Sequence, residues 1–175
     1  MKINSNEYLN FLQECNNRKS NYPLDLEWKK LSDEWLYKAF KKKYMYNFES
    51  FGRPIIQTPI DMVALQEIIW EIKPDLIIET GIAHGGSLIM SASMLAMLDL
   101  CEAIDSEENF NPKESKRKVL GIDIDIRKHN REAIEKHPMS SRIQMIEGSS
   151  ISPKIIKQVE EEAKNYKKIL VCLDQ

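Results

Sequence analysis

The fold is decided by residues 74–87, whose sequence is PDLIIETGIAHGGS. An apolar run, Leu76–Ile78, leads to a carboxylate, and a loop with three glycines follows before an apolar helical pattern begins at Leu88. This order predicts a buried strand, a glycine loop and a helix. Because glycine has no side chain, a ligand can approach the loop backbone and the N-terminus of the next helix. The stretch therefore predicts a nucleotide-like ligand.

The loop departs from two common nucleotide-binding loops. Gly81 and Gly86 have the spacing of a P-loop, but Ser87 stands where that loop needs a lysine, which disfavours an NTPase. Residues 82–84 separate Gly81 from the next glycine, so the G-x-G-x-x-G fingerprint is broken. An NAD-dependent oxidoreductase is thus the alternative. A carboxylate two residues before the first glycine, Glu79, can meet a ligand amino group, and S-adenosylmethionine fits such a site.

Three segments carry a resemblance to a known family. They are residues 79–87 (ETGIAHGGS), 121–127 (GIDIDIR) and 147–150 (EGSS). Together they resemble the cephalosporin hydroxylase family, over residues 35–174. Its members are similar to class I S-adenosylmethionine-dependent methyltransferases and include rhamnosyl O-methyltransferases. The resemblance implies an O-methyltransferase that acts on a sugar or another small hydroxylated substrate, as in lipopolysaccharide or polysaccharide biosynthesis. Hydroxylase chemistry is not expected, because the three histidines show no pairing that suits an iron triad.

The predicted cofactor site combines the glycine loop with the ends of the next two strands. Its expected residues are Glu79, Gly81, His84, Gly85, Gly86, Ser87, Asp123, Asp125, Ser149 and Ser150. By resemblance, Asp123 accepts hydrogen bonds from the ribose hydroxyls. Strand alternation places Asp125 on the same side, although it can instead cap the helix that opens near Arg127. Ser149 and Ser150 meet the adenine edge or form only a turn and helix cap.

Two further site residues have open roles. His84 orients the substrate, acts as a base or is structural. Asp174 follows the last predicted strand, where metal-dependent O-methyltransferases of the resembled class place a carboxylate ligand for Mg²⁺. By resemblance, Asp174 is a candidate metal ligand, and its acidic partners are expected beyond Gln175. Such a metal holds the acceptor oxygens and lowers the pKa of the acceptor hydroxyl.

The alternation of short apolar strands with helices predicts an α/β protein, a Rossmann-like doubly wound parallel sheet of the class I methyltransferase type. The expected strands are 76–78, 119–124, 142–146 and 168–173, and the expected helices are 27–46, 58–72, 88–100, 127–136 and 152–166, with a surface loop at 101–118. Residues 1–57 are expected to form a helical N-terminal extension, and 58–175 the cofactor-binding domain. Because the last predicted strand has an unprotected apolar edge, C-terminal strands are expected to be missing. A truncated, inactive fragment is therefore a further alternative.

Composition limits the functions open to the chain. Hydrophobic residues make up 42% and charged residues 30% of 175, with a net charge of -2 and a pI near 6.0. This balance predicts a globular protein with a small-molecule substrate and no nucleic-acid partner. The sequence shows no signal peptide and no apolar run that suggests a membrane span, so a cytoplasmic location is expected. The three cysteines suggest free thiols. Homo-oligomer formation is left open.

Overall fold

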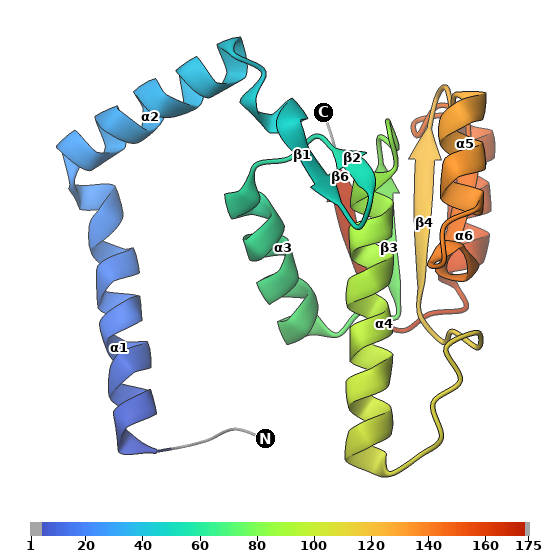
Figure 1. Cartoon of the computed structure of the whole chain (residues 1–175), viewed down its shortest axis with the longest axis horizontal. Helices are drawn as coiled ribbons and strands as arrows, with labels where there is room; N and C mark the ends of the chain where they lie inside the picture. Colours follow the sequence, from blue (N-terminus) through green and yellow to red (C-terminus); the bar gives the residue numbers. More distant parts are fainter. Residues whose placement is uncertain (1–4, 174–175) are drawn as a thin grey trace. The chain divides into compact units, whose positions relative to one another are not determined.

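The computed structural model describes residues 5–173 and divides into two units after Tyr44 (Figure 1). The first unit contains helices α1 (Asn6–Asn21) and α2 (Leu26–Lys41), joined by the 3-10 helix η1 (Tyr22–Leu24). Each long helix is capped by a side chain, because Ser5 accepts a hydrogen bond from the Tyr8 N–H and Asp25 from the Trp28 N–H. The helix expected at 27–46 is confirmed as α2, although it ends at Lys41.

The second unit begins with a hairpin that was not predicted. The 3-10 helix η2 (Tyr44–Asn47) leads into β1 (Phe48–Ser50), which pairs antiparallel with β2 (Arg53–Ile55). The two turn residues, Phe51 and Gly52, both have positive φ, the conformation that a two-residue hairpin turn of the I′ type requires. The expected boundary at 57/58 places this hairpin in the N-terminal extension, whereas its contacts group it with the second unit.

A parallel sheet forms the centre of the second unit. Its strands are β3 (Leu76–Thr80), β4 (Lys118–Asp123), β5 (Ile143–Glu147) and β6 (Ile169–Leu173), in the spatial order β5-β4-β3-β6. Helix α3 (Pro59–Ile72) precedes the sheet, and α4 (Gly86–Ser106), α5 (Lys128–Glu135) and α6 (Pro153–Ala163) connect its strands, with the 3-10 helix η3 (Ser140–Arg142) before β5. The predicted Rossmann-like α/β fold is confirmed. In such sheets ligands bind beyond the carboxyl ends of the strands, where the strand order reverses; here that point lies between β3 and β6.

Helices cover both faces of the sheet. On one face, Ile77 and Val119 pack with buried residues of α3, α4 and α5, among them Ile69, Leu88 and Ile134. On the other face, the strands pack against α6. That layer contains Leu76, Ile78, Leu120, Ile122 and Ile155. The arrangement is therefore doubly wound, with a core layer on each side of the sheet.

Helix α4 is longer than expected. It continues to Ser106, so the surface loop predicted at 101–118 is wrong for its first six residues. By length and composition alone α4 is able to cross a membrane, with a mean hydropathy of 1.6 over 18 residues, contrary to the expectation that no run in this chain suggests a span. Its residues Leu88, Ile89, Ala92 and Leu95 are, however, fully buried in the core. These residues are part of the core, and 39% of the 18-residue window is buried.

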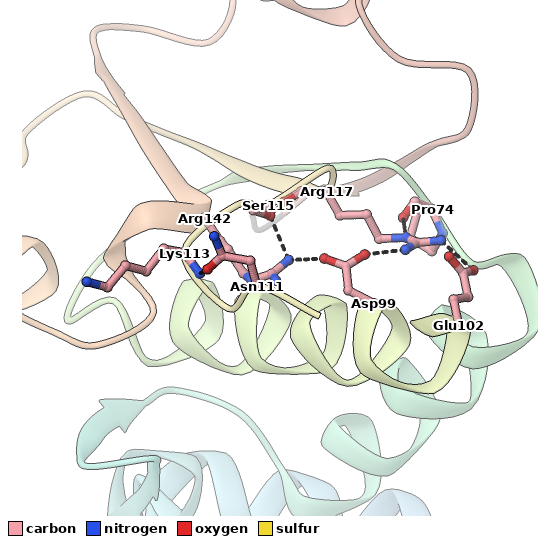
Figure 2. A network of polar contacts seen from close by, with 8 residues as sticks. All are labelled: Pro74, Asp99, Glu102, Asn111, Lys113, Ser115, Arg117 and Arg142. Atoms are coloured by element: carbon pink, nitrogen blue, oxygen red, sulfur yellow. Dashed lines mark hydrogen bonds and ion pairs between the residues drawn. The ribbon is translucent and has the colours of Figure 1, made fainter. Parts of the chain in front are cut away.

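A buried charge network ties the segment after α4 to the amino end of the sheet (Figure 2). Asp99 of α4 forms ion pairs with both Arg117 and Arg142, and these three side chains are only 9%, 8% and 2% exposed. Arg117 also contacts Glu102 Oε1 at 2.7 Å, and Arg142 Nη1 lies 2.6 Å from Ser115 Oγ. Burial opposes the charge on Arg117, but its bonds to Glu102 and Asp99 outweigh this and raise its pKa.

Candidate functional site

The glycine loop between β3 and α4 is held by its own backbone. The Gly81 N–H donates to Ile122 O at 2.8 Å, which joins the start of the loop to the end of β4. The Gly85 N–H donates to Ile82 O at 2.7 Å and closes a tight turn. Within this turn Ala83 has a φ of +45°, a left-handed conformation that disfavours residues with a side chain. The loop thus depends on further contacts to keep its shape.

Asp123 supplies part of that support from the carboxyl end of β4. Its Oδ2 accepts hydrogen bonds from the N–H groups of Ile82 at 2.7 Å and Ala83 at 3.2 Å, and Oδ1 accepts one from Asp125 at 3.1 Å. Burial alone would raise the pKa of the Asp123 carboxyl, but the donors Asp125, Ile82, Ala83 and Ile124 outweigh it and lower the pKa. The predicted ribose ligand is therefore an ionised carboxylate that also fixes the loop.

This lowered pKa predicts a pH dependence of stability. A carboxyl whose pKa is lower in the folded state stabilises the fold above its unfolded pKa of about 3.9, and this contribution is lost as the pH falls through the folded value. The free-energy difference between wild type and Asp123→Asn should therefore shrink between about pH 5 and about pH 3. Urea unfolding across this range measures it, and a difference that does not change with pH would contradict the assignment.

Glu79 lies beneath the loop and is almost completely buried. Its Oε1 accepts a hydrogen bond from the Ser87 hydroxyl, which comes from the first turn of α4. Burial and then the negative charge of Glu79 raise the pKa of the Cys172 thiol to about 11, so Cys172 stays protonated at neutral pH. The two strands on either side of the reversal point thus bring a carboxylate and a thiol together.

A small cavity of about 90 Å³ opens at this place. Its walls include Glu79 and Ser87, the loop residues 81–84 and Gly86, and Cys172 and Leu173 of β6. Since water occupies about 30 Å³ in the liquid, the cavity holds one small polar group rather than a whole nucleotide. A buried carboxylate in its wall favours a positively charged group such as an ammonium.

Two glycines of the loop have no room for a side chain. A Cβ on Gly85, which has a φ of +82°, would lie 2.3 Å from Ile134 Cδ1 of α5. A Cβ on Gly86 would lie 2.3 Å from the backbone oxygen of Pro54 in the hairpin. The hairpin and α5 therefore press directly on the loop, and both positions require glycine.

The structure brings together some, not all, of the predicted site residues. Five of them line the cavity: Glu79, Gly81, His84, Gly86 and Ser87. Asp123 bonds to the backbone of the glycine loop, and Gly85 lies in the turn of that loop. Asp125 lies beyond the end of β4, with a carboxylate that is 73% exposed and 4.0 Å from Arg127 Nε. Because Asp125 lies outside the strand, the alternation of side chains along β4 does not place it on the same side as Asp123.

The remaining predicted residues lie in or beyond the segment after β5. Ser149 and Ser150 form a turn, in which Ser152 N–H donates to Ser149 O at 2.9 Å. The preceding Gly148 N–H donates to Asp123 O at 2.8 Å, so the turn follows directly from the site. Asp174 lies outside the described residues. Within residues 5–173, the structure shows no group of three histidine, cysteine or acidic residues able to hold a metal.

Two residues of the site were missed by sequence reasoning. Arg53 of the hairpin and Asn130 of α5 hydrogen-bond to the carbonyl groups of the glycine loop. Asn130 is buried and lies four residues before Ile134 on the same face of α5, so a polar residue in an apolar stripe was a signal. Nothing in the sequence around Arg53 indicated its partners.

The fold and the loop first define a class. A doubly wound sheet with a glycine loop after its first strand, and a carboxylate at the end of the next strand, is typical of nucleotide-binding α/β proteins. Within that class, the sequence model of the family described as rhamnosyl O-methyltransferase/CmcI matches residues 42–175. The chain belongs to this family, which confirms the resemblance found in the sequence.

Solved structures of CmcI are similar to part of the chain. One, described as CmcI with SAH, is 20% identical, and the match covers 58% of this chain and 43% of that chain, with a TM-score of 0.39. A second, described as CmcI with Mg-SAM, is 18% identical. The match covers 74% of this chain and 46% of that chain, with a TM-score of 0.45. An apo structure of CmcI is 18% identical. The match covers 72% of this chain and 45% of that chain, with a TM-score of 0.44. The chain spans less than half the length of each. Among curated proteins no match was found.

Proposed function

We propose that the chain forms the cofactor-binding part of an S-adenosylmethionine-dependent O-methyltransferase. Its proposed acceptor is a hydroxyl group of a sugar or another small hydroxylated molecule, in line with the family description, which names a rhamnosyl O-methyltransferase. The observation that carries the proposal is the buried Glu79 beneath a glycine loop whose backbone is bonded to Asp123. These two carboxylates suit the two ends of that cofactor.

Each carboxylate has a role that fits its surroundings. Asp123 accepts two backbone N–H bonds on Oδ2 and one on Oδ1, which leaves lone-pair capacity on Oδ1 for a ribose hydroxyl. Glu79 lies in the wall of a cavity large enough for one ammonium group, which the amino-acid end of the cofactor carries. Ser87 donates to Glu79 and thereby keeps it oriented. The cofactor would then lie along the loop, over the reversal point of the sheet.

The chemistry divides between the cofactor and the chain. When bound, the cofactor supplies an electrophilic methyl group on a sulfonium sulfur. Asp123 would hold the ribose and Glu79 the ammonium, and these two contacts would fix the orientation of the cofactor. His84 lies in the wall of the cavity and is the described residue that we propose for contact with the acceptor or for proton transfer.

A role for Mg²⁺ rests on a residue outside the described part of the chain. We retain Asp174 as the proposed ligand, since the family resemblance places a carboxylate there. The described residues do not form a metal site by themselves, so no step is assigned to a metal. We also propose a cytoplasmic enzyme that acts in lipopolysaccharide or polysaccharide biosynthesis. Whether it forms a homo-oligomer is a matter for sedimentation analysis.

Calorimetric titration of the purified chain tests the proposal. S-adenosylmethionine should bind saturably, whereas NAD⁺ should not, because the loop lacks the dinucleotide fingerprint. Asp123→Asn should weaken the binding by about tenfold to a hundredfold, since it removes a charged acceptor of hydroxyl and backbone hydrogen bonds. Asp105→Asn, an exposed change at the far end of α4, is the matched control and should bind as the wild type does.

Other outcomes of the titration separate the alternatives. Binding of NAD⁺ without S-adenosylmethionine would replace the methyltransferase proposal with an oxidoreductase. Binding of neither ligand by a folded chain would show an inactive fragment. Equal affinity of the wild type and Asp123→Asn would remove the proposed role of Asp123 and leave the cofactor assignment standing.

A further inference from the structure

Two linked side chains hold the outer side of the glycine loop. Arg53 donates to the His84 carbonyl oxygen from Nε at 3.0 Å and from Nη2 at 2.7 Å. The same Nη2 donates to Asn130 Oδ1 at 3.0 Å. Asn130 Nδ2 in turn donates to the Ala83 carbonyl oxygen at 2.8 Å. Two consecutive carbonyl groups of the loop are thus held by one connected pair, which we call the Arg53–Asn130 clamp.

The clamp and Asp123 fix the glycine loop from two sides. Ala83 gives its N–H to Asp123 and its C=O to Asn130, so both neighbouring peptide groups are fixed in direction. This residue has the disfavoured left-handed conformation, with a φ of +45°. Without one of the two holds, the chain at Ala83 is free to rotate into an extended or helical conformation. The shape of the loop therefore depends on both.

The chemical types in the clamp are specific. A guanidinium presents several N–H donors in a rigid fork, which allows Arg53 to reach one carbonyl twice and Asn130 as well. A lysine has a single flexible ammonium and cannot reproduce the fork. Asn130 must accept from Arg53 and donate to Ala83, and an amide does both, whereas an aspartate only accepts. These requirements make the clamp testable by conservative substitutions.

Neither clamp residue lines the small cavity beneath the loop. We propose that Arg53 and Asn130 are positioning residues, which keep the loop in the conformation that binds the cofactor without touching it. The inference rests on the proposed function for the ligand, but the hold on the loop is independent of it. A loop that is ordered before binding costs less entropy when the ligand arrives. Loss of the clamp should therefore lower affinity for the cofactor.

Amide hydrogen exchange tests the hold on the loop without any ligand. In Arg53→Ala, the amides of Ile82 and Ala83 should exchange about tenfold faster than in the wild type, while that of Leu120 in the central sheet is unchanged. Asn130→Asp should show the same pattern. The control is Arg18→Ala, since the Arg18 side chain bonds to Cys15 and Glu14 of its own helix, α1, in the other unit. Unchanged exchange at Ile82 and Ala83 in Arg53→Ala would overturn the proposal.

Titration with S-adenosylmethionine tests whether Arg53 and Asn130 position the glycine loop for binding. Arg53→Ala should bind about tenfold more weakly, and Arg53→Lys should not recover the loss although it keeps the charge. Millimolar guanidinium should partly restore binding to Arg53→Ala, whereas a variant that is merely less stable would gain nothing, because this concentration is far too low to change stability measurably. Faster loop exchange with unchanged affinity would overturn the proposal. If the wild type binds no S-adenosylmethionine, the proposed function fails, and hydrogen exchange alone decides whether the clamp holds the loop.

Discussion

Replacing Asp99 by alanine is expected to lower the free energy of unfolding by about 3–5 kcal/mol. Asp99 is the buried carboxylate between the guanidinium groups of Arg117 and Arg142 (Figure 2). Arg142 is almost fully buried, and its Nη2 already lacks a hydrogen-bond partner within the described part of the chain. Without Asp99, Arg117 still pairs with Glu102, but the buried Arg142 loses its carboxylate partner and keeps the Ser115 hydroxyl. A buried cation without its counter-charge is far costlier than the loss of an exposed ion pair.

Calorimetry or urea unfolding measures this effect. For a chain of this size, the loss corresponds to a fall in melting temperature of about 10 °C. Asp99→Asn keeps acceptor capacity but loses the charge, so it should fall between alanine and the wild type. Glu102→Ala is the matched control, because the Glu102 side chain is 48% exposed and its loss should cost about 1 kcal/mol or less. Equal effects of Asp99→Ala and Glu102→Ala would show that the network is not buried in solution.

Replacing Gly86 by alanine is expected to damage both stability and cofactor binding. The added Cβ would lie 2.3 Å from Pro54 O, 2.7 Å from Pro54 C and 2.8 Å from Ile55 Cα, all of them backbone atoms. A side chain cannot rotate away to relieve this contact, so the hairpin must move from α4. We expect a loss of about 3 kcal/mol, at the upper end of overpacking effects. Because Arg53 is carried by the same strand, the clamp on the loop should open as well.

Gly52→Ala is the matched control for this change. A Cβ at Gly52 would meet nothing within 4 Å, although its φ of +83° is unfavourable for alanine. It should cost about 1–2 kcal/mol through backbone strain and leave affinity for S-adenosylmethionine unchanged. Thermal unfolding and calorimetric titration of the two variants separate a steric effect from a conformational one. A Gly86→Ala variant as stable as Gly52→Ala would mean that the hairpin does not contact the loop closely.

The sheet could be predicted because its signals are local. The strands β3 to β6 each consist of a short apolar run between polar or helix-capping residues, and all four are found within a few residues of their expected positions. Thr58 and Pro59 marked the start of α3 for the same reason, since Thr58 caps the helix with its own side chain. Glu79 and Asp123 followed from the fold, because the ends of parallel strands meet at one edge.

The rest of the site depends on contacts between distant parts of the chain. Arg53 meets His84 and Asn130, which lie 31 and 77 residues away, and no local pattern encodes such a pairing. The segment around Arg117 was predicted to be a surface loop because it is polar. Its charged residues, however, bond to one another and to Asp99 of α4, which allows burial without loss of pairing. Composition alone does not distinguish a solvated charge from a paired one.

The sheet has its buried ion pairs at the amino ends of the strands and the loop that we propose for ligand binding at their carboxyl ends. A chain organised in this way can acquire mutations in the loop and adapt to a new acceptor while its main electrostatic support stays intact. Conversely, mutations at the amino ends of the strands lower the stability of the fold without changing the residues that we propose for ligand binding. For directed evolution this suggests libraries at cavity-lining positions other than Glu79 and Gly86, in a parent whose Asp99, Arg117 and Arg142 are kept fixed.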